Sequence, residues 1–343
     1  MPAYPDKYLT LLDHEVLAYV DGVLDAYPAD AVEATIEQQR QFYEAMCRRF
    51  AGTSPANVTS VDTELLALSG EPAHSGPPVP VRHYRKQGDN DDVRVVYLHG
   101  GGFVVGNLES HDSICAELCD RTGFPLTAVD YRLAPEHPHP AAFDDVMLAI
   151  QHALNDSSHV VLCGDSAGAN LAAAASHQLR HSHPGKVLGQ VLIYPALGGD
   201  HNQGSYLEHA EAPMLSLQEV LFYERVRIPQ EYLALADQLD AGADVASLTA
   251  EQRHFVTTMG PLLDNDFSNL PDTLCLSASC DPLHDDGEQY VAAIKAINGS
   301  AEFVSETGLV HGYLRARNIS KLAGASFTRV VEALRRMGGA APV

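Results

Sequence analysis

The stretch Gly164-Asp165-Ser166-Ala167-Gly168 decides the fold, because it joins an apolar run to an alanine-rich one. Residues 159–163 (His-Val-Val-Leu-Cys) are typical of a buried strand, and residues 167–180 have the composition of a helix. A serine at such a sharp strand-to-helix turn is strained, and the residues two positions away on each side must be small. Both are glycine, so the pattern predicts an exposed, nucleophilic Ser166 hydroxyl at a helix N-terminus. A plain tight turn with Ser166 as N-cap is the alternative.

A second glycine-rich stretch, His99-Gly100-Gly101-Gly102-Phe103 (the oxyanion loop), follows the β-branched run 93–98, which is typical of a buried strand. Successive glycines leave backbone N–H groups uncovered, so a substrate can approach them closely. The N–H groups of Gly101 and Gly102, with that of Ala167, are therefore candidate donors to an oxyanion. His99 is expected to shape this loop rather than to transfer protons. A flexible turn is the alternative for a glycine run of this kind.

A serine nucleophile needs a base and an acid that orients the base. Residues 274–279 are expected to form a late strand, and Asp281 follows at its carboxyl end, where active-site groups of open α/β sheets gather. Pro282 cannot donate a ladder hydrogen bond, so the strand should stop there. Asp285 and Asp286 are rivals for the acid, but they are expected to favour the first turn of the next helix instead.

The chain has 17 histidines, so a histidine alone is a weak signal. His311 follows a further expected strand, residues 301–305, in a loop where a general base would stand. His284 is the only other histidine after Asp281, and it is too close to Asp281 in sequence to fold back onto it. The order Ser166, Asp281, His311 therefore predicts a catalytic triad whose activity rises with pH as the imidazole loses its proton.

Together these motifs resemble the hormone-sensitive-lipase family of α/β-hydrolases, in its GDSAG subgroup of bacterial esterases, and most of all the enterobacterial acetyl esterase type. Ala169 departs from the pattern, because the family usually has a further glycine there. The matching stretches cover roughly the last three quarters of the chain, and they are residues 99–103, 106–108, 130–136 (Asp-Tyr-Arg-Leu-Ala-Pro-Glu), 164–168, 281–286 and 311–312.

The resemblance implies an α/β-hydrolase fold, with a mostly parallel central sheet flanked by helices and a helical cap. It implies a serine carboxylesterase for short-chain acyl esters, acetyl to butyryl, with no metal and no organic cofactor. Two alternatives remain. An amidase or deacetylase would use the same triad, and comparing ester with anilide turnover separates the two. A ligand-binding regulatory protein on this fold, like the plant gibberellin receptors, would lack the catalytic histidine, whereas His311 is present here.

The composition suits a globular enzyme, with 45% hydrophobic residues and a formal net charge of −23. That charge argues against binding nucleic acid or an anionic membrane, and it favours a small neutral ester, with water, as the substrate. No apolar run approaches the roughly 20 residues of a membrane helix. Residues 1–7 (Met-Pro-Ala-Tyr-Pro-Asp-Lys) lack the basic region followed by an apolar core that is typical of a secretory signal. A cytoplasmic protein with six reduced cysteines is expected. The oligomeric state is not readable, although members of the resembled family often form homodimers.

The order of the motifs predicts a hydrolase core formed by residues 51–197 and 264–343. Residues 198–263 break the alternation of strands and helices, and they are expected to form a helical cap insertion packed with an N-terminal helical segment, residues 1–50. In that segment Leu9, Leu12, Val16 and Val20 share one helical stripe, and a second helix is expected around 36–50. Residues 79–84 are expected to form an edge strand. Candidate walls of the substrate pocket are Phe103, Leu215, Phe222 and Tyr223.

Overall fold

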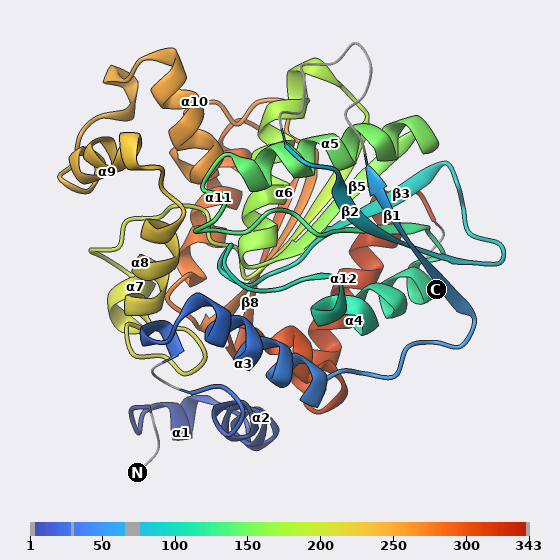
Figure 1. The fold of residues 1–343 in the computed structure, drawn as a ribbon, viewed down its shortest axis with the longest axis horizontal. Coiled ribbons are helices and arrows are strands. Elements are labelled where there is room, and N and C mark those ends of the chain that lie inside the picture. The colour runs from blue at the N-terminus through green and yellow to red at the C-terminus, as the bar shows by residue number, and fades with distance from the viewer. Residues whose placement is uncertain (1–3, 29–30, 66–75, 341–343) are drawn as a thin grey trace.

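The computed structural model describes residues 4–28, 31–65 and 76–340. Its centre is an eight-stranded sheet in the order β1-β2-β4-β3-β5-β6-β7-β8 (Figure 1). β2 pairs antiparallel with both β1 and β4, and every later pairing is parallel. The strands are β1 (Val58–Leu65), β2 (Val79–Lys86), β3 (Val93–Leu98), β4 (Leu126–Val129), β5 (His159–Asp165), β6 (Val187–Ile193), β7 (Asp272–Cys280) and β8 (Ala301–Val310).

Helices cover both faces of the sheet (Figure 1). α4 and α12 share one core cluster with Val95 and Tyr97 of β3, whereas α5, α6 and α11 share another with Val96 and Leu98. Successive side chains of a strand point to opposite faces, so a buried strand between two helical layers must be apolar throughout. The helices are α4 (Leu108–Thr122), α5 (Ala141–Asp156), α6 (Ala167–Ser182), α11 (His284–Ala296) and α12 (Lys321–Met337).

The turn from β5 to α6 is the tightest point of the core. Ser166 has φ 53° and ψ −118°, the strained conformation that the pentapeptide predicts. A Cβ added at Gly164 would lie 2.6 Å from the carbonyl carbon of Gly168, and one at Gly168 would lie 2.0 Å from the carbonyl oxygen of Leu98. The prediction that both flanking positions must be small is therefore confirmed, since no side chain fits at either.

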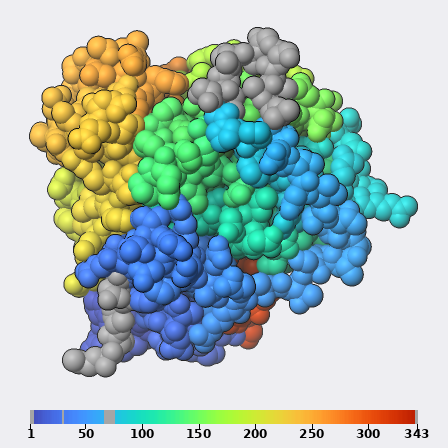
Figure 2. All heavy atoms as spheres, viewed as in Figure 1, coloured from blue at the N-terminus to red at the C-terminus, as the bar shows by residue number. Residues whose placement is uncertain are grey.

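Between the end of β6 at Ile193 and the start of β7 at Asp272 the chain leaves the sheet, and this insertion contains the residues expected to form the cap. α8 of this insertion meets the N-terminal helix α3, since Tyr223 and Tyr43 both pack against Val104 and Val105 beside the oxyanion loop. In Figure 2 the blue N-terminal residues and the yellow residues of the insertion adjoin on one side of the molecule. The helices of these two segments are α1 (Tyr8–Leu11), α2 (His14–Leu24), α3 (Ile36–Arg49), α7 (Ser205–Glu208), α8 (Leu217–Val226), α9 (Leu233–Asp240) and α10 (Ala250–Met259).

The prediction that Leu9, Leu12, Val16 and Val20 share one helical stripe is wrong. The chain forms two helices, α1 and α2, because the Asp13 side chain accepts a hydrogen bond from the N–H of Glu15 and caps a new helix. Leu9 is consequently exposed, while Leu12 and Val16 are buried. The cap at Asp13, three residues before the apolar Val16, begins a new helix there, although the apolar spacing from Leu9 to Val20 looks continuous.

The expected edge strand also lies elsewhere. β2 is paired on both sides, and β1 forms that edge of the sheet. Pro80 indicated an edge because it has no N–H to donate. The ladder between β2 and β4 begins only at Val81, opposite Val129, so the proline removes no hydrogen bond from it.

None of the helices within the described ranges is long and apolar enough to cross a membrane. The six cysteines are all free and buried, as the expectation of reduced thiols requires.

Replacing Gly168 by alanine should destabilise the fold, because the new methyl group would overlap the Leu98 carbonyl. We expect the free energy of unfolding, measured by urea denaturation, to fall by about 3 kcal/mol or more. Gly185→Ala is the matched control: φ is 76° there but nothing lies within 4 Å of the new Cβ, so it should cost only about 1–2 kcal/mol. Equal losses in the two variants would contradict the close packing at the elbow.

Candidate active site

Ser166, His311 and Asp281 form a continuous hydrogen-bonded chain. The Ser166 Oγ lies 2.9 Å from His311 Nε2, and His311 Nδ1 lies 2.7 Å from the Asp281 Oδ2. Both oxygens of the buried Asp281 carboxylate accept hydrogen bonds from nitrogen, so Nδ1 carries the ring proton and Nε2 faces the serine with its lone pair. This tautomer is the one that can take the proton of Ser166.

Each of the three side chains is placed by the carboxyl end of a strand. Ser166 follows β5, and its N–H donates to the carbonyl of Ile193 on β6 at 2.8 Å. Asp281 follows β7, and its second oxygen accepts from the N–H of Leu283 at 2.9 Å. His311 follows β8, which runs five residues further than expected, to Val310. Adjacent parallel strands end at one edge of the sheet, so residues far apart in sequence converge there.

The two rival carboxylates stand in the first turn of α11, as expected. Asp285 accepts from the N–H of Ser205 at 2.9 Å. Asp286 is buried and accepts from the N–H groups of Leu197, Gly198 and Gly199, where the insertion begins. Sequence reasoning missed this second contact, because it joins residues almost ninety positions apart.

The oxyanion loop lies against the serine. Gly101 and Gly102 have φ values of 134° and 59°, which glycine adopts at no steric cost. A Cβ at Gly101 would lie 2.1 Å from the Val105 carbonyl oxygen, and one at Gly102 would lie 2.5 Å from the Tyr223 ring. Both glycines and Ala167 line the same cavity as Ser166. Ala167 is the first residue of α6, so its N–H has no partner within the helix.

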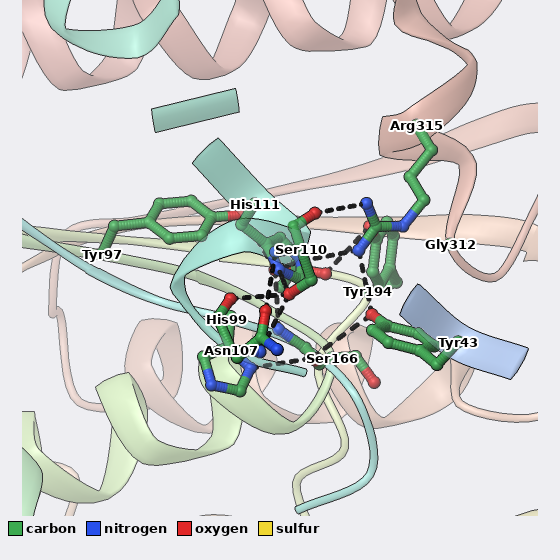
Figure 3. A network of polar contacts seen from close by, with 12 residues as sticks. Tyr43, Tyr97, His99, Asn107, Ser110, His111, Ser166, Tyr194, Gly312 and Arg315 are labelled. Atoms are coloured by element: carbon green, nitrogen blue, oxygen red, sulfur yellow. Dashed lines mark hydrogen bonds and ion pairs between the residues drawn. The ribbon is translucent and has the colours of Figure 1, made fainter. Parts of the chain in front are cut away.

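His99 is buried behind this loop. Its Nδ1 lies 2.9 Å from the carbonyl oxygen of Gly100, and its ring stacks on Tyr131 with centroids 4.3 Å apart. Burial, reinforced by the neighbouring His111, lowers the pKa of His99 to about 3, so the ring is neutral and Nδ1 donates to Gly100. Figure 3 shows His99 and His111 beside Ser166.

A cavity of about 700 Å³ opens above Ser166 and His311. Phe103, Leu215 and Tyr223 line it, as proposed for the pocket walls. Phe222 does not, because neighbouring residues of a helix point about 100° apart; its ring packs edge-on against Tyr223 instead, at 5.4 Å.

Several lining residues escaped the sequence reasoning. Tyr19, Tyr43 and Met46 come from the N-terminal helices α2 and α3. The apolar periodicity of these helices indicated that one face is buried, but not that this face lines the cavity. Met214 lines the cavity with φ 77°, a strained conformation for a residue with a side chain. Its Cε would lie 3.7 Å from a Cβ at Gly312, next to His311. No sequence signal marked this position.

One group of potential metal ligands occurs within the described residues, formed by His284, Asp285 and Glu288. Its histidine already has protein partners at both ring nitrogens, Asp285 and the Ser305 Oγ, each at 2.9 Å. Glu288 is exposed. The triad residues do not belong to this group, and nothing in its geometry points to a bound ion.

A serine, an aspartate and a histidine at the carboxyl ends of parallel strands, beside a glycine-rich loop, define a hydrolase of the α/β type. A profile of the alpha/beta hydrolase fold family matches residues 95–315. The ethyl acetate hydrolase of Pseudomonas putida is 31% identical over 321 residues, which are 90% of this chain and 92% of that protein. The acetyl esterase of Salmonella schwarzengrund (strain CVM19633) is 29% identical over 325 residues, 92% of this chain and 91% of that one.

Among solved structures, the hyperthermophilic esterase of the archaeon Pyrobaculum calidifontis superposes with a TM-score of 0.78 at 26% identity, covering 99% of this chain and all of that one. The chain belongs to the alpha/beta hydrolase fold family, and it is a hydrolase. The fold class and the family resemblance expected from the motifs are thereby confirmed.

The low pKa of His99 predicts how the stability of the fold changes with pH. The pKa of His99 is about 3 in the folded protein and about 6.5 in an unfolded chain. The stability that the neutral His99 contributes is therefore fully present above about pH 6.5 and is lost as the pH falls towards 3. Between pH 7 and pH 5 the wild type should lose about 2 kcal/mol more stability than His99→Gln, measured by urea unfolding at both pH values.

The side chain of His14 is 87% exposed, so His14→Gln serves as the control and should keep the pH dependence of the wild type. The same pH dependence in His99→Gln and the wild type would show that His99 is not held neutral by the fold.

Proposed function

We propose that this carboxylic ester hydrolase cleaves short-chain acyl esters, from acetyl to butyryl, by way of an acyl-enzyme on Ser166. The observation that carries the proposal is the hydrogen-bonded chain from the Ser166 Oγ through His311 to the buried Asp281, at the floor of a cavity. A small neutral ester and water are the reactants.

His311 takes the proton of Ser166 as the serine oxygen attacks the ester carbonyl. Asp281 holds Nδ1–H, and its charge stabilises the imidazolium that forms. The imidazolium then protonates the leaving alcohol, which gives the acyl-enzyme. Water, activated by the same imidazole, attacks the acyl carbonyl and releases the acid and free Ser166.

The negative charge of each tetrahedral intermediate falls on the former carbonyl oxygen. The proposed donors to it are the N–H groups of Gly101, Gly102 and Ala167, and the proposal is supported by the fact that all three residues line the cavity around Ser166. The N-terminus of α6 adds its partial positive charge at the same point. One such donor contributes roughly a hundred- to a thousandfold to the rate.

The acyl preference is supported by the substrates in the names of two relatives, ethyl acetate hydrolase and acetyl esterase. The cavity is apolar near Leu215 and Tyr223, and a short acyl chain would lie against these walls. We further propose that residues 198–263 and 1–50 act as a cap on a core formed by 51–197 and 264–343. The cavity supports this proposal, because its lining comes from the cap segments as well as from the core.

Turnover of p-nitrophenyl acetate, butyrate, octanoate and palmitate tests the proposal. The wild type should favour acetate and butyrate, and Ser166→Ala should lose about 10⁴-fold or more of kcat on both. A preference for octanoate or palmitate would refute the short-chain assignment, and turnover that survives in Ser166→Ala would refute the acyl-enzyme. Faster cleavage of a matched anilide than of the ester would make the chain an amidase with the same triad.

Asp281→Asn should lower kcat by about 10⁴-fold with little change in KM, because the amide no longer selects the productive tautomer of His311. Asp285→Asn is the control, since Asp285 bonds to the N–H of Ser205 and not to His311. It should retain kcat within about threefold. A comparable loss in the two variants would remove Asp281 from its proposed role.

A further inference from the structure

We propose that Arg315, four residues after His311, is a positioning residue that holds the oxyanion loop in place by providing the counter-charge for the buried carboxylate of Asp165. The inference rests on the proposed function, because the loop is what stabilises the transition state. Its basis is a polar network that joins Asp165, His111, Arg315 and Tyr43. Figure 3 shows His111, Arg315 and Tyr43 of this network.

Asp165 is the residue before the nucleophile, and only 5% of it is exposed. Its Oδ1 accepts from the N–H of Gly100 at 2.9 Å and from the Tyr97 hydroxyl at 2.8 Å. Its Oδ2 lies 3.3 Å from the Tyr194 hydroxyl. Gly100 immediately precedes the proposed oxyanion donors, so this one carboxylate connects the elbow to the loop and fixes the distance between them.

A buried carboxylate is costly unless a positive charge compensates it. One basic group adjoins it directly: His111, whose Nε2 lies 3.3 Å from the Asp165 Oδ1. The hydrogen bonds of Ser110 decide its state. The Ser110 Oγ donates to the carbonyl of Asn107 at 2.7 Å, so it must accept from His111 Nδ1, 2.8 Å away.

The proton of His111 is therefore on Nδ1. Burial lowers the pKa of His111 and, with the charge of Arg315, outweighs the opposing effect of Asp165, so Nε2 carries no second proton. That nitrogen accepts from the Arg315 Nη2 at 3.1 Å and cannot donate to Asp165. The positive charge that balances Asp165 consequently resides on Arg315.

Arg315 is itself buried, and its hydrogen bonds all go to neutral groups. Nη1 donates to the Ser110 carbonyl at 2.7 Å, and Nη2 donates to the Tyr43 hydroxyl at 3.0 Å as well as to His111. Burial by itself would raise the pKa of Asp165, but its polar neighbours, among them Arg315 and the Tyr97 hydroxyl, reverse the shift and hold the pKa well below its ordinary value. The carboxylate thus stays ionised and keeps its bond to Gly100.

Arg315 also reaches the other side of the Gly100 peptide. Tyr43, on α3 of the N-terminal segment, accepts from Arg315 and lies with its hydroxyl 3.4 Å from the Gly100 carbonyl oxygen. The N–H of Gly100 is therefore held by Asp165 and its C=O is approached by Tyr43, and Arg315 supports both. The loop after the catalytic histidine is in this way connected to the loop that binds the oxyanion.

Removing the guanidinium with Arg315→Met should lower kcat on p-nitrophenyl acetate by about 100-fold, comparable to the loss of one oxyanion donor, with KM within about threefold. Arg317→Met is the matched control. Arg317 is two residues further on, equally buried, and pairs with Glu117 at 2.8 Å, away from the oxyanion loop. It should lower the melting temperature and keep kcat within about threefold.

A double-mutant cycle separates the counter-charge from general damage to the fold. Asp165→Asn removes the negative charge but leaves an oxygen that can accept from Gly100. If Arg315 acts through that charge, adding Arg315→Met to Asp165→Asn should cost less than about threefold in kcat, against about 100-fold in the wild-type background. Equal losses in both backgrounds would overturn the inference.

Arg315→Lys covers the case in which Arg315→Met does not fold. It keeps the cation, so kcat should stay within about tenfold of the wild type. A loss in kcat as large as that of Asp281→Asn, or an effect on KM alone, would contradict the inference. Ser166→Ala reports on the proposed function separately: if it is inactive while Arg315→Met is fully active, only the role of Arg315 fails.

Discussion

The structure depends on the contact between the first turn of α6 and the end of β3. Gly168 approaches the Leu98 carbonyl so closely that a methyl group would lie 2.0 Å from its oxygen. Because nothing separates the two backbones, the chain after β5 must turn sharply at Ser166, and the chain after β3 must run directly beneath the serine. The nucleophile and the oxyanion loop are therefore set relative to each other by main-chain packing, which is stiffer than any contact between flexible side chains.

Charge makes a second connection between the same two segments. Asp165 bonds to Gly100 across the elbow, and the network behind it extends to His111 and Arg315. The hydrogen-bonded chain that reaches Ser166 uses a different buried carboxylate, Asp281. The two buried acids have two proposed roles: Asp281 orients the imidazole, and Asp165 orients the backbone of the oxyanion loop. Each of the two carboxylates accepts hydrogen bonds from groups arranged around it.

Much of the site could be predicted because its parts follow strands that the sequence marks clearly. Ser166, Asp281 and His311 each come directly after an apolar run, and parallel strands bring their carboxyl ends to one edge. The N-terminal helices were harder to predict, because the cap at Asp13 begins a new helix within an apolar spacing that looks continuous. Phe222 was expected to line the cavity and does not. Composition indicates that α8 contacts the cavity, but the direction of each side chain depends on how the helix is rotated against its neighbours.

The sequence by itself determined the strand-to-helix elbow, the glycine loop and the order of the triad, because these depend on local backbone geometry and on which residue types can do the chemistry. Only the tertiary structure decided the partners of Asp165, Asp286 and Tyr43. Those contacts join residues tens to hundreds of positions apart, such as Arg315 and Tyr43. Polar residues at such distances carry no periodic signal. Their pairing follows from the burial of one charge. A buried charge is stable only where the fold places a compensating polar or charged group beside it.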